Sequence, residues 1–148
     1  MDIKAAVQLI EASQTQEKIT QDDLPYSRDA LEPCMSKKCV TVHYDILTTK
    51  YFDKYRETGD LFQKAGALLH NNFYWPMMQP YQKVNTPGKT IKHRIEQNHT
   101  SLAKFKTAVQ DAAKTVQGNG WVLIMQDLQI QTVQNHVLKP GILWAIDI

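Results

Sequence analysis

The sequence predicts an α+β fold in which the helices come first and a small antiparallel sheet comes last. Between residues 36 and 116, apolar side chains recur every three or four positions, which is the period of a half-buried helix. From Trp121 onward the pattern changes to short segments rich in Val, Ile, Leu and Trp, namely WVLIM, LQIQTV and ILWAI. Strands that follow the helices, instead of alternating with them, are typical of the α+β class.

The length and charge of the chain restrict its class. It has 148 residues, with 17 basic and 15 acidic side chains, so it can form one folded unit with a nearly neutral surface. We divide it into an N-terminal extension (1–23), a helical-hairpin domain (24–80) and a C-terminal α/β domain (81–148). No stretch approaches the roughly 20 apolar residues of a membrane-spanning helix, so we expect no transmembrane segment.

The first residues predict a short amphipathic helix over 3–10, followed by a linker over 13–23. They carry acids and glutamines and resemble neither a secretory signal nor an arginine-rich transit peptide. Cys34 and Cys39 suit neither a disulfide framework nor a paired zinc motif, which favours a reducing compartment.

A helical hairpin is expected next. Ser36 is a candidate N-cap, and the helix after it should bury one face, made of Val40, His43, Tyr44, Leu47, Tyr51 and Tyr55. Thr58-Gly59-Asp60 breaks this helix, and a second one runs from Phe62 until Pro76 stops it. A link this short predicts that the two helices are antiparallel.

A second pair of helices and the sheet complete the prediction. Ile91 and Ile95 indicate one helix, and a longer periodic pattern runs from Leu102 to Val116. Gly118-Asn119-Gly120 ends the helical part, and the three strands are separated by turns at Gln126-Asp127 and Lys139-Pro140-Gly141.

Several motifs occur in an order that resembles the iron/manganese superoxide dismutase family, from residue 24 to the end of the chain. The motifs are Leu24-Pro25-Tyr26, Asp29-Ala30-Leu31-Glu32-Pro33, Ser36-Lys37, Val42-His43-Tyr44, Phe73-Tyr74-Trp75 with Pro80, Gly120-Trp121 and Ile146-Asp147. The resemblance implies the family's fold, a helical hairpin followed by a sheet, here as a degenerate or truncated member that lacks the closing helices.

The resemblance also implies a metal site. Dismutation in this family uses one redox ion held by three imidazoles and one carboxylate. His43 matches the first histidine ligand and Asp147 the carboxylate. The position of the second histidine is occupied by Asn71, with His70 just before it, and one residue of offset turns a helical side chain by about 100°. His70 would therefore serve only if the helix rewinds. The fourth ligand would follow Asp147 in a W-E-H segment, but the sequence ends at Ile148.

Positions around the site are also altered. Tyr51 matches the family's gateway tyrosine, and Trp75 and Trp121 match residues that line its pocket. Leu47 stands where the family has a histidine one turn after the first ligand. Ala67 stands where many iron enzymes have a glutamine, and Asn119, near its place in some manganese enzymes, is not an obvious replacement.

These changes favour a dismutase-like protein without turnover and without a bound cofactor. Without closing helices the sheet would expose a set of apolar side chains, which predicts a partner surface. The set is Leu123, Leu143, Trp144 and Ile146. We therefore expect a structural subunit of a larger protein assembly, mitochondrial by resemblance and otherwise cytoplasmic.

Two alternatives remain open. In one, His70 reaches an iron or manganese ion and the chain is an active dismutase that converts superoxide to hydrogen peroxide and oxygen. In the other, the protein is an RNA-contacting ribosomal module that uses a stacking Tyr81 and basic residues in the middle third. Those residues are Lys83, Lys89, Lys92, His93, Arg94, Lys104 and Lys106.

Overall fold

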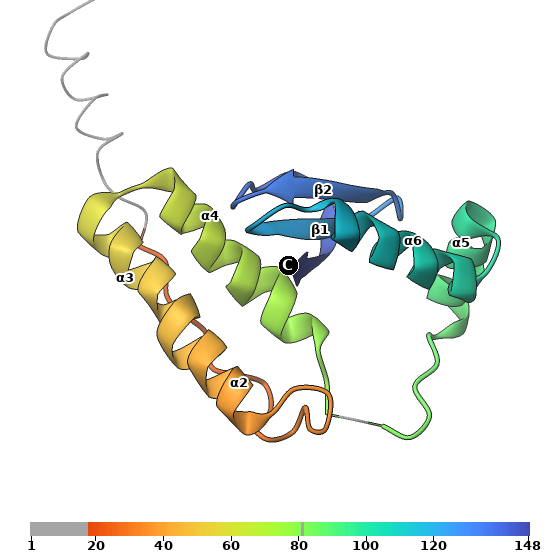
Figure 1. Cartoon of the computed structure of the whole chain (residues 1–148), viewed down its shortest axis with the longest axis horizontal. Coiled ribbons are helices and arrows are strands. Elements are labelled where there is room, and N and C mark those ends of the chain that lie inside the picture. The colour runs from red at the N-terminus through yellow and green to blue at the C-terminus, as the bar shows by residue number, and fades with distance from the viewer. Residues whose placement is uncertain (1–17, 81) are drawn as a thin grey trace, which may run out of the picture.

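A computed structural model describes residues 18–80 and 82–148 of the chain (Figure 1). The amphipathic helix predicted over residues 3–10 lies outside the described residues, as does the first part of the linker. The described part contains a helical hairpin, a second helical pair and a three-stranded antiparallel sheet. The predicted α+β class is thereby confirmed.

The first arm of the hairpin is one continuous helix in three parts. It consists of α2 (Lys37–Thr41), the π-helical turn η1 (Val42–Thr48) and α3 (Thr49–Thr58). The Ser36 hydroxyl accepts a hydrogen bond from the Cys39 N–H, which is the expected N-cap. Gly59 ends the helix with a φ of 68°, a left-handed conformation that glycine adopts without strain.

The second arm has the same composite form. It consists of α4 (Leu61–Leu69), the π-helical turn η2 (His70–Tyr74) and the 3₁₀ turn η3 (Trp75–Met77). The Asp60 carboxylate accepts from the Phe62 N–H and caps the start of α4. Both arms of the hairpin therefore change from α- to π-helical winding part-way along their length.

The π-helical turn in the first arm changes which side chains are buried. A π turn contains an extra residue, so the positions after it rotate relative to a regular α-helix. Leu47 is 45% exposed and Ile46 is 58% exposed, whereas Thr48 is fully buried. The prediction that Leu47 belongs to the buried stripe is therefore wrong, because that stripe assumed uniform α-helical winding.

The second helical pair precedes the sheet. Helices α5 (Lys89–His99) and α6 (Leu102–Thr115) are followed by β1 (Gly120–Met125), β2 (Ile130–Gln134) and β3 (Ile142–Asp147). The strand order is β2-β1-β3, with β1 antiparallel to both neighbours. Trp121 lies opposite Asp147, so the last residue of β3 is placed beside the start of the central strand.

The sheet is covered on both faces. Trp121 and Leu123 belong to the core that the sheet shares with the hairpin. On the other face, Ile124 packs with side chains of α5 and α6, and partly buried Leu143, Trp144 and Ile146 pack against the same cluster. Leu123 is fully buried. The prediction of an uncovered apolar sheet is therefore wrong, because its second face lies against the helical pair.

No helix within residues 18–80 and 82–148 is long and apolar enough to cross a bilayer.

A substitution at Gly120 tests how tightly the chain is packed where α6 leads into the sheet. A Cβ atom at this position would overlap the Val133 carbonyl oxygen and a methyl group of Val116, while one at Gly88 would meet nothing. We expect Gly120→Ala to lower the free energy of unfolding by about 1–3 kcal/mol, because the neighbouring backbone must move. Chemical denaturation measures the loss. The control Gly88→Ala should stay within about 0.5 kcal/mol of wild type, and equal effects of the two would contradict the packing argument.

Candidate metal centre

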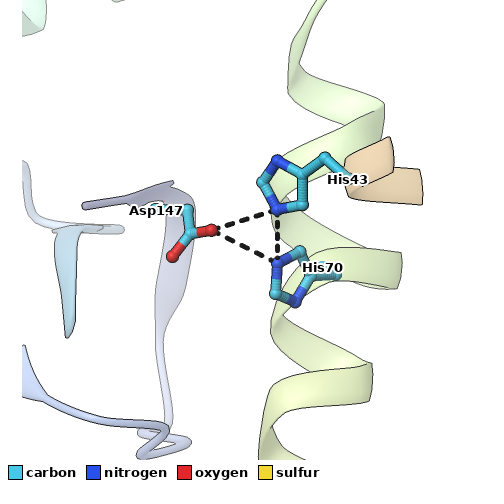
Figure 2. Close-up of side chains that lie close together, drawn as sticks. All are labelled: His43, His70 and Asp147. Atoms are coloured by element: carbon cyan, nitrogen blue, oxygen red, sulfur yellow. Dashed lines mark hydrogen bonds and ion pairs between the residues drawn. The ribbon is translucent and has the colours of Figure 1, made fainter. Parts of the chain in front are cut away.

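Two histidines and an aspartate meet between the hairpin and the last strand (Figure 2). His43 Nε2 lies 3.0 Å from His70 Nε2 and 3.0 Å from Asp147 Oδ2, and His70 Nε2 lies 3.5 Å from the same oxygen. Among residues 18–80 and 82–148, this is the one cluster of three or more side chains of metal-ligating type. One donor comes from each hairpin arm and one from β3.

His70 points into this cluster (Figure 2). The helix becomes π-helical from His70 onward, so its winding differs from the uniform α-helix used to place the two residues. Asn71 faces away from the cluster and bonds the main chain and side chain of Asp22. The sequence allows His70 to be a metal ligand only if the helix is rewound, and the structure contains such rewinding.

A single hydrogen bond orients the His70 ring. Its Nδ1 lies 2.7 Å from the Gly66 carbonyl oxygen, which can only accept, so Nδ1 carries the proton. In the neutral ring the Nε2 lone pair therefore faces His43 and Asp147. A ligating histidine is commonly held this way, with its other nitrogen bonded to a carbonyl. The ring is 1% exposed, so water cannot easily replace this bond.

Asp147 supplies negative charge to the cluster. Burial by itself raises the pKa of this carboxyl, but its contacts with His43 and His70 outweigh burial and hold the pKa below its ordinary range. The side chain is therefore a carboxylate at neutral pH. Its oxygen and the two Nε2 atoms are all potential electron-pair donors that converge on one point.

The donor set fits a divalent transition-metal ion. Donors bonded to one ion at about 2.1 Å, with angles between about 90° and 115°, lie about 3.0–3.5 Å apart. The three measured separations lie in this range. Two imidazoles and one carboxylate are also a ligand set that suits non-haem ferrous iron and leaves positions open for solvent or substrate.

Aromatic rings flank the cluster. The Tyr51 ring stacks on His70 with centroids 5.4 Å apart, and Trp75 lies 5.0 Å from His43. Trp121 lies 4.8 Å from His70, on the side of the sheet. Tyr51, Trp75 and Trp121, the pocket residues singled out in the sequence, are thus all at the site.

Comparison with known proteins identifies the family. Residues 87–143 match the iron/manganese superoxide dismutase C-terminal domain. The chain is 31% identical to an iron superoxide dismutase of Sulfolobus acidocaldarius, over 78% of this chain and 69% of that protein. It is 30% identical to an iron superoxide dismutase of Pyrobaculum aerophilum, over 90% of this chain and 74% of the relative.

The chain belongs to the iron/manganese superoxide dismutase family. A manganese superoxide dismutase of Halobacterium salinarum, 32% identical over 82% of this chain and 71% of its own length, shows that similarity extends to relatives named for the other metal.

The other three residues compared with the family in the sequence are Leu47, Ala67 and Asn119. Leu47 lies on the exposed side of the first arm, and Ala67 is fully buried under Ile19 and Phe52. The Asn119 carbonyl accepts a hydrogen bond from the Asn135 N–H beside the paired strands β1 and β2.

His136 is a site residue that the sequence analysis missed. It follows β2 and is 8% exposed, and its Nδ1 accepts a hydrogen bond from the Trp121 indole at 2.9 Å. Its ring lies 4.6 Å from Tyr51 and 6.2 Å from His70. Burial, and then the proximity of His70, lower the His136 pKa. The sequence offers only one sign of this role, a histidine that closely follows the second predicted strand, and His136 belongs to none of the family motifs.

Thr48 supports the first ligand from inside the hairpin. Its hydroxyl donates to the His43 carbonyl at 2.8 Å and accepts from the Trp75 indole at 3.1 Å. We expect Thr48→Val to lower the free energy of unfolding by about 1–3 kcal/mol, because it leaves a buried N–H without an acceptor. Thr48→Ser keeps the hydroxyl and should lose less. Denaturant titration measures the free energy of unfolding of both variants. Equal losses of stability in the two would contradict the role of the hydroxyl.

Asp147 predicts a pH dependence for the metal-free protein. Its folded pKa lies below the ordinary value of about 3.9, so the unfolded chain binds a proton first as the pH falls. Stability that is present above about pH 4 should therefore decline toward lower pH. Denaturation at several pH values should give a flatter profile for Asp147→Asn than for wild type. Parallel profiles would contradict the shifted pKa.

Proposed function

We propose that this chain binds one iron or manganese ion through His43, His70 and Asp147 and acts as a superoxide dismutase. The observation that carries the proposal is the convergence of two imidazole nitrogens and a carboxylate oxygen within 3.5 Å of one another. Without a cation, only a shared proton can offset the repulsion between these three electron-pair donors.

An iron or manganese ion held by His43, His70 and Asp147 would supply the one-electron chemistry that superoxide dismutation needs. The side chains around the site determine its charge, the orientation of the ligands and the access of water. Asp147 contributes negative charge, and the bond from His70 to the Gly66 carbonyl holds an imidazole lone pair toward the centre. The aromatic rings of Tyr74, Trp75 and Trp121 limit the approach of water.

Two side chains hold protons beside the centre. Peroxide formation from superoxide consumes two protons, so proton donors near the cluster are needed. Burial and the Asp147 charge raise the Tyr51 pKa, which keeps the phenol protonated. In neutral His136, Nδ1 accepts from Trp121, so the ring proton is on Nε2. Tyr51 contacts both His70 and His136, which places both proton holders together.

A structural subunit without turnover is the second candidate. It is supported by an apolar groove of about 440 Å³ next to His43, whose lining includes Val42 and Leu47. Val42, Ile46 and Leu47 are 41%, 58% and 45% exposed. A protein partner could cover such a surface. A mitochondrial location, a host assembly and contact with RNA remain predictions.

Metal content tests the first candidate directly. The whole chain, expressed with added iron or manganese, should contain about one ion per molecule by elemental analysis and should remove superoxide. His70→Ala and Asp147→Ala each delete a donor, so each should weaken metal binding by more than about 100-fold, beyond the loss typical of outer-shell partners.

The matched control is His93→Ala, which removes an exposed histidine of α5 away from the cluster. It should keep both metal content and turnover. A folded, metal-free wild-type protein would contradict the proposal and favour the structural subunit. Full metal content without turnover would retain the binding site and overturn the catalytic part.

A further inference from the structure

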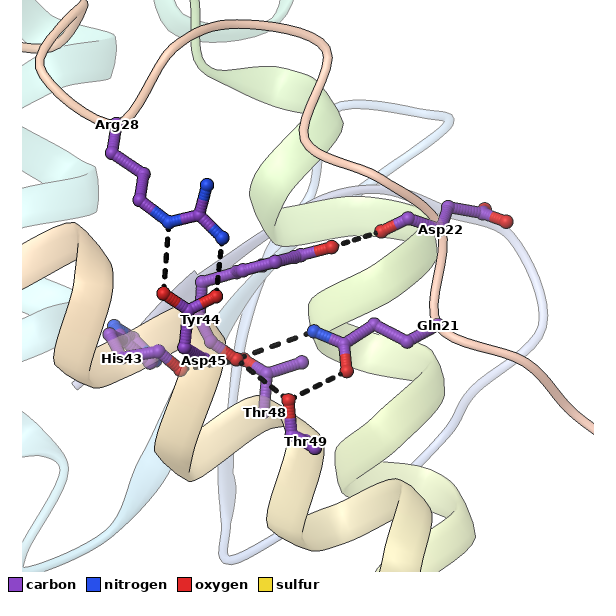
Figure 3. Close-up of polar contacts among 8 residues, drawn as sticks. All are labelled: Gln21, Asp22, Arg28, His43, Tyr44, Asp45, Thr48 and Thr49. Atoms are coloured by element: carbon purple, nitrogen blue, oxygen red, sulfur yellow. Dashed lines mark hydrogen bonds and ion pairs between the residues drawn. The ribbon is translucent and has the colours of Figure 1, made fainter.

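Residues 18–28, which we call the strap, cross the helical hairpin next to both π-helical turns (Figure 3). Ile19 is 8% exposed and packs with Phe52, Tyr55 and Ala67, which fixes the start of the strap on the hairpin. At the other end, Arg28 pairs with Asp45. The polar contacts between these two ends are made at the turns that carry the two histidines.

At the first turn, the strap bonds one main-chain carbonyl and one side-chain hydroxyl. Gln21 Nε2 donates to the Tyr44 carbonyl at 3.3 Å, and Gln21 Oε1 accepts from the Thr49 hydroxyl at 2.9 Å (Figure 3). The carbonyl of His43 is bonded from inside the hairpin by Thr48. Side-chain donors thus add hydrogen bonds to the carbonyls of His43 and Tyr44, two adjacent residues near the start of the turn, which stabilises a winding that is otherwise rare.

At the second turn, the strap binds the residue next to His70. Asn71 Oδ1 accepts from the Asp22 main-chain N–H at 2.7 Å, and Asn71 Nδ2 donates to Asp22 Oδ2 at 2.8 Å. The Tyr44 hydroxyl donates to the Asp22 carbonyl at 2.6 Å (Figure 3). Asp22 therefore links the residue after His43 to the residue after His70.

We propose that Gln21, Asp22 and Asn71 are positioning residues that hold the two π-helical turns in the winding and mutual register that bring His43 and His70 Nε2 to 3.0 Å. The inference rests on the proposed metal site. Asn71 turns outward to make these bonds, and the same winding turns His70 inward. An α-helical register at Asn71 would rotate both side chains by about 100°.

The Asp22–Asn71 pair permits a test by exchange. Asn71→Asp places two carboxylates against each other and removes the amide donor. The exchange variant Asp22→Asn/Asn71→Asp restores a donor and an acceptor with reversed polarity, so coupling between the two positions becomes measurable. Thr20→Ala is the matched control, because Thr20 is an exposed residue of the same strap.

Cobalt(II) serves as the probe, since its visible absorption reports binding by the whole chain. We expect Asn71→Asp to weaken cobalt binding by about 10- to 100-fold, the loss seen when an outer-shell partner is removed. The exchange variant should recover most of this loss, and Thr20→Ala should leave the affinity unchanged. If Asn71→Asp is folded but binds cobalt within about twofold of wild type, the positioning role is overturned.

A second readout does not need metal. Imidazole ¹⁵N shifts in the metal-free chain report whether His70 keeps its proton on Nδ1. The expected result is loss of this state in Asn71→Asp and its return in the exchange variant. If wild type binds no cobalt, the proposed function fails, yet these shifts still decide the strap. A His70 signal that is the same in all variants would overturn it.

Discussion

The structure of the site depends on the π-helical winding in both arms of the hairpin. A helix that switches from α to π winding changes the direction in which the side chains after the switch point. In the first arm this change exposes Leu47 and buries Thr48. In the second arm the π turn begins at His70, which faces the sheet, while Asn71 faces the strap.

Rare winding has to be stabilised by contacts outside the helix, and here those contacts come from both sides. Thr48 and Trp75 form the inner support under the His43 carbonyl. The strap forms the outer support, through Gln21 and Asp22. The sheet then presents Asp147 to the two histidines, because β3 ends opposite Trp121. Hairpin, strap and sheet are each required to place one part of the centre.

The charge balance of the cluster explains why its three donors favour a cation. Asp147 remains ionised, and the Gly66 carbonyl fixes the tautomer of His70. Nearby Tyr51 and His136 are both neutral, for separate physical reasons. Burial and a negative neighbour hold the phenol neutral, whereas burial holds the imidazole neutral. The centre thus combines an anionic ligand with two neutral proton-bearing side chains and neighbouring aromatic rings.

Periodicity and capping residues in the sequence predicted the helices, the strands, the Ser36 cap and the α+β class, because these depend on local spacing. Motif order predicted the family, and with it His43 and Asp147. Local spacing could not predict the direction of His70, since it depends on a π turn supported by residues 49 positions away in the chain. Nor could it predict that His136 reaches Trp121, or that α5 and α6 cover the sheet. Those features depend on contacts between distant segments, and only the tertiary structure decides them.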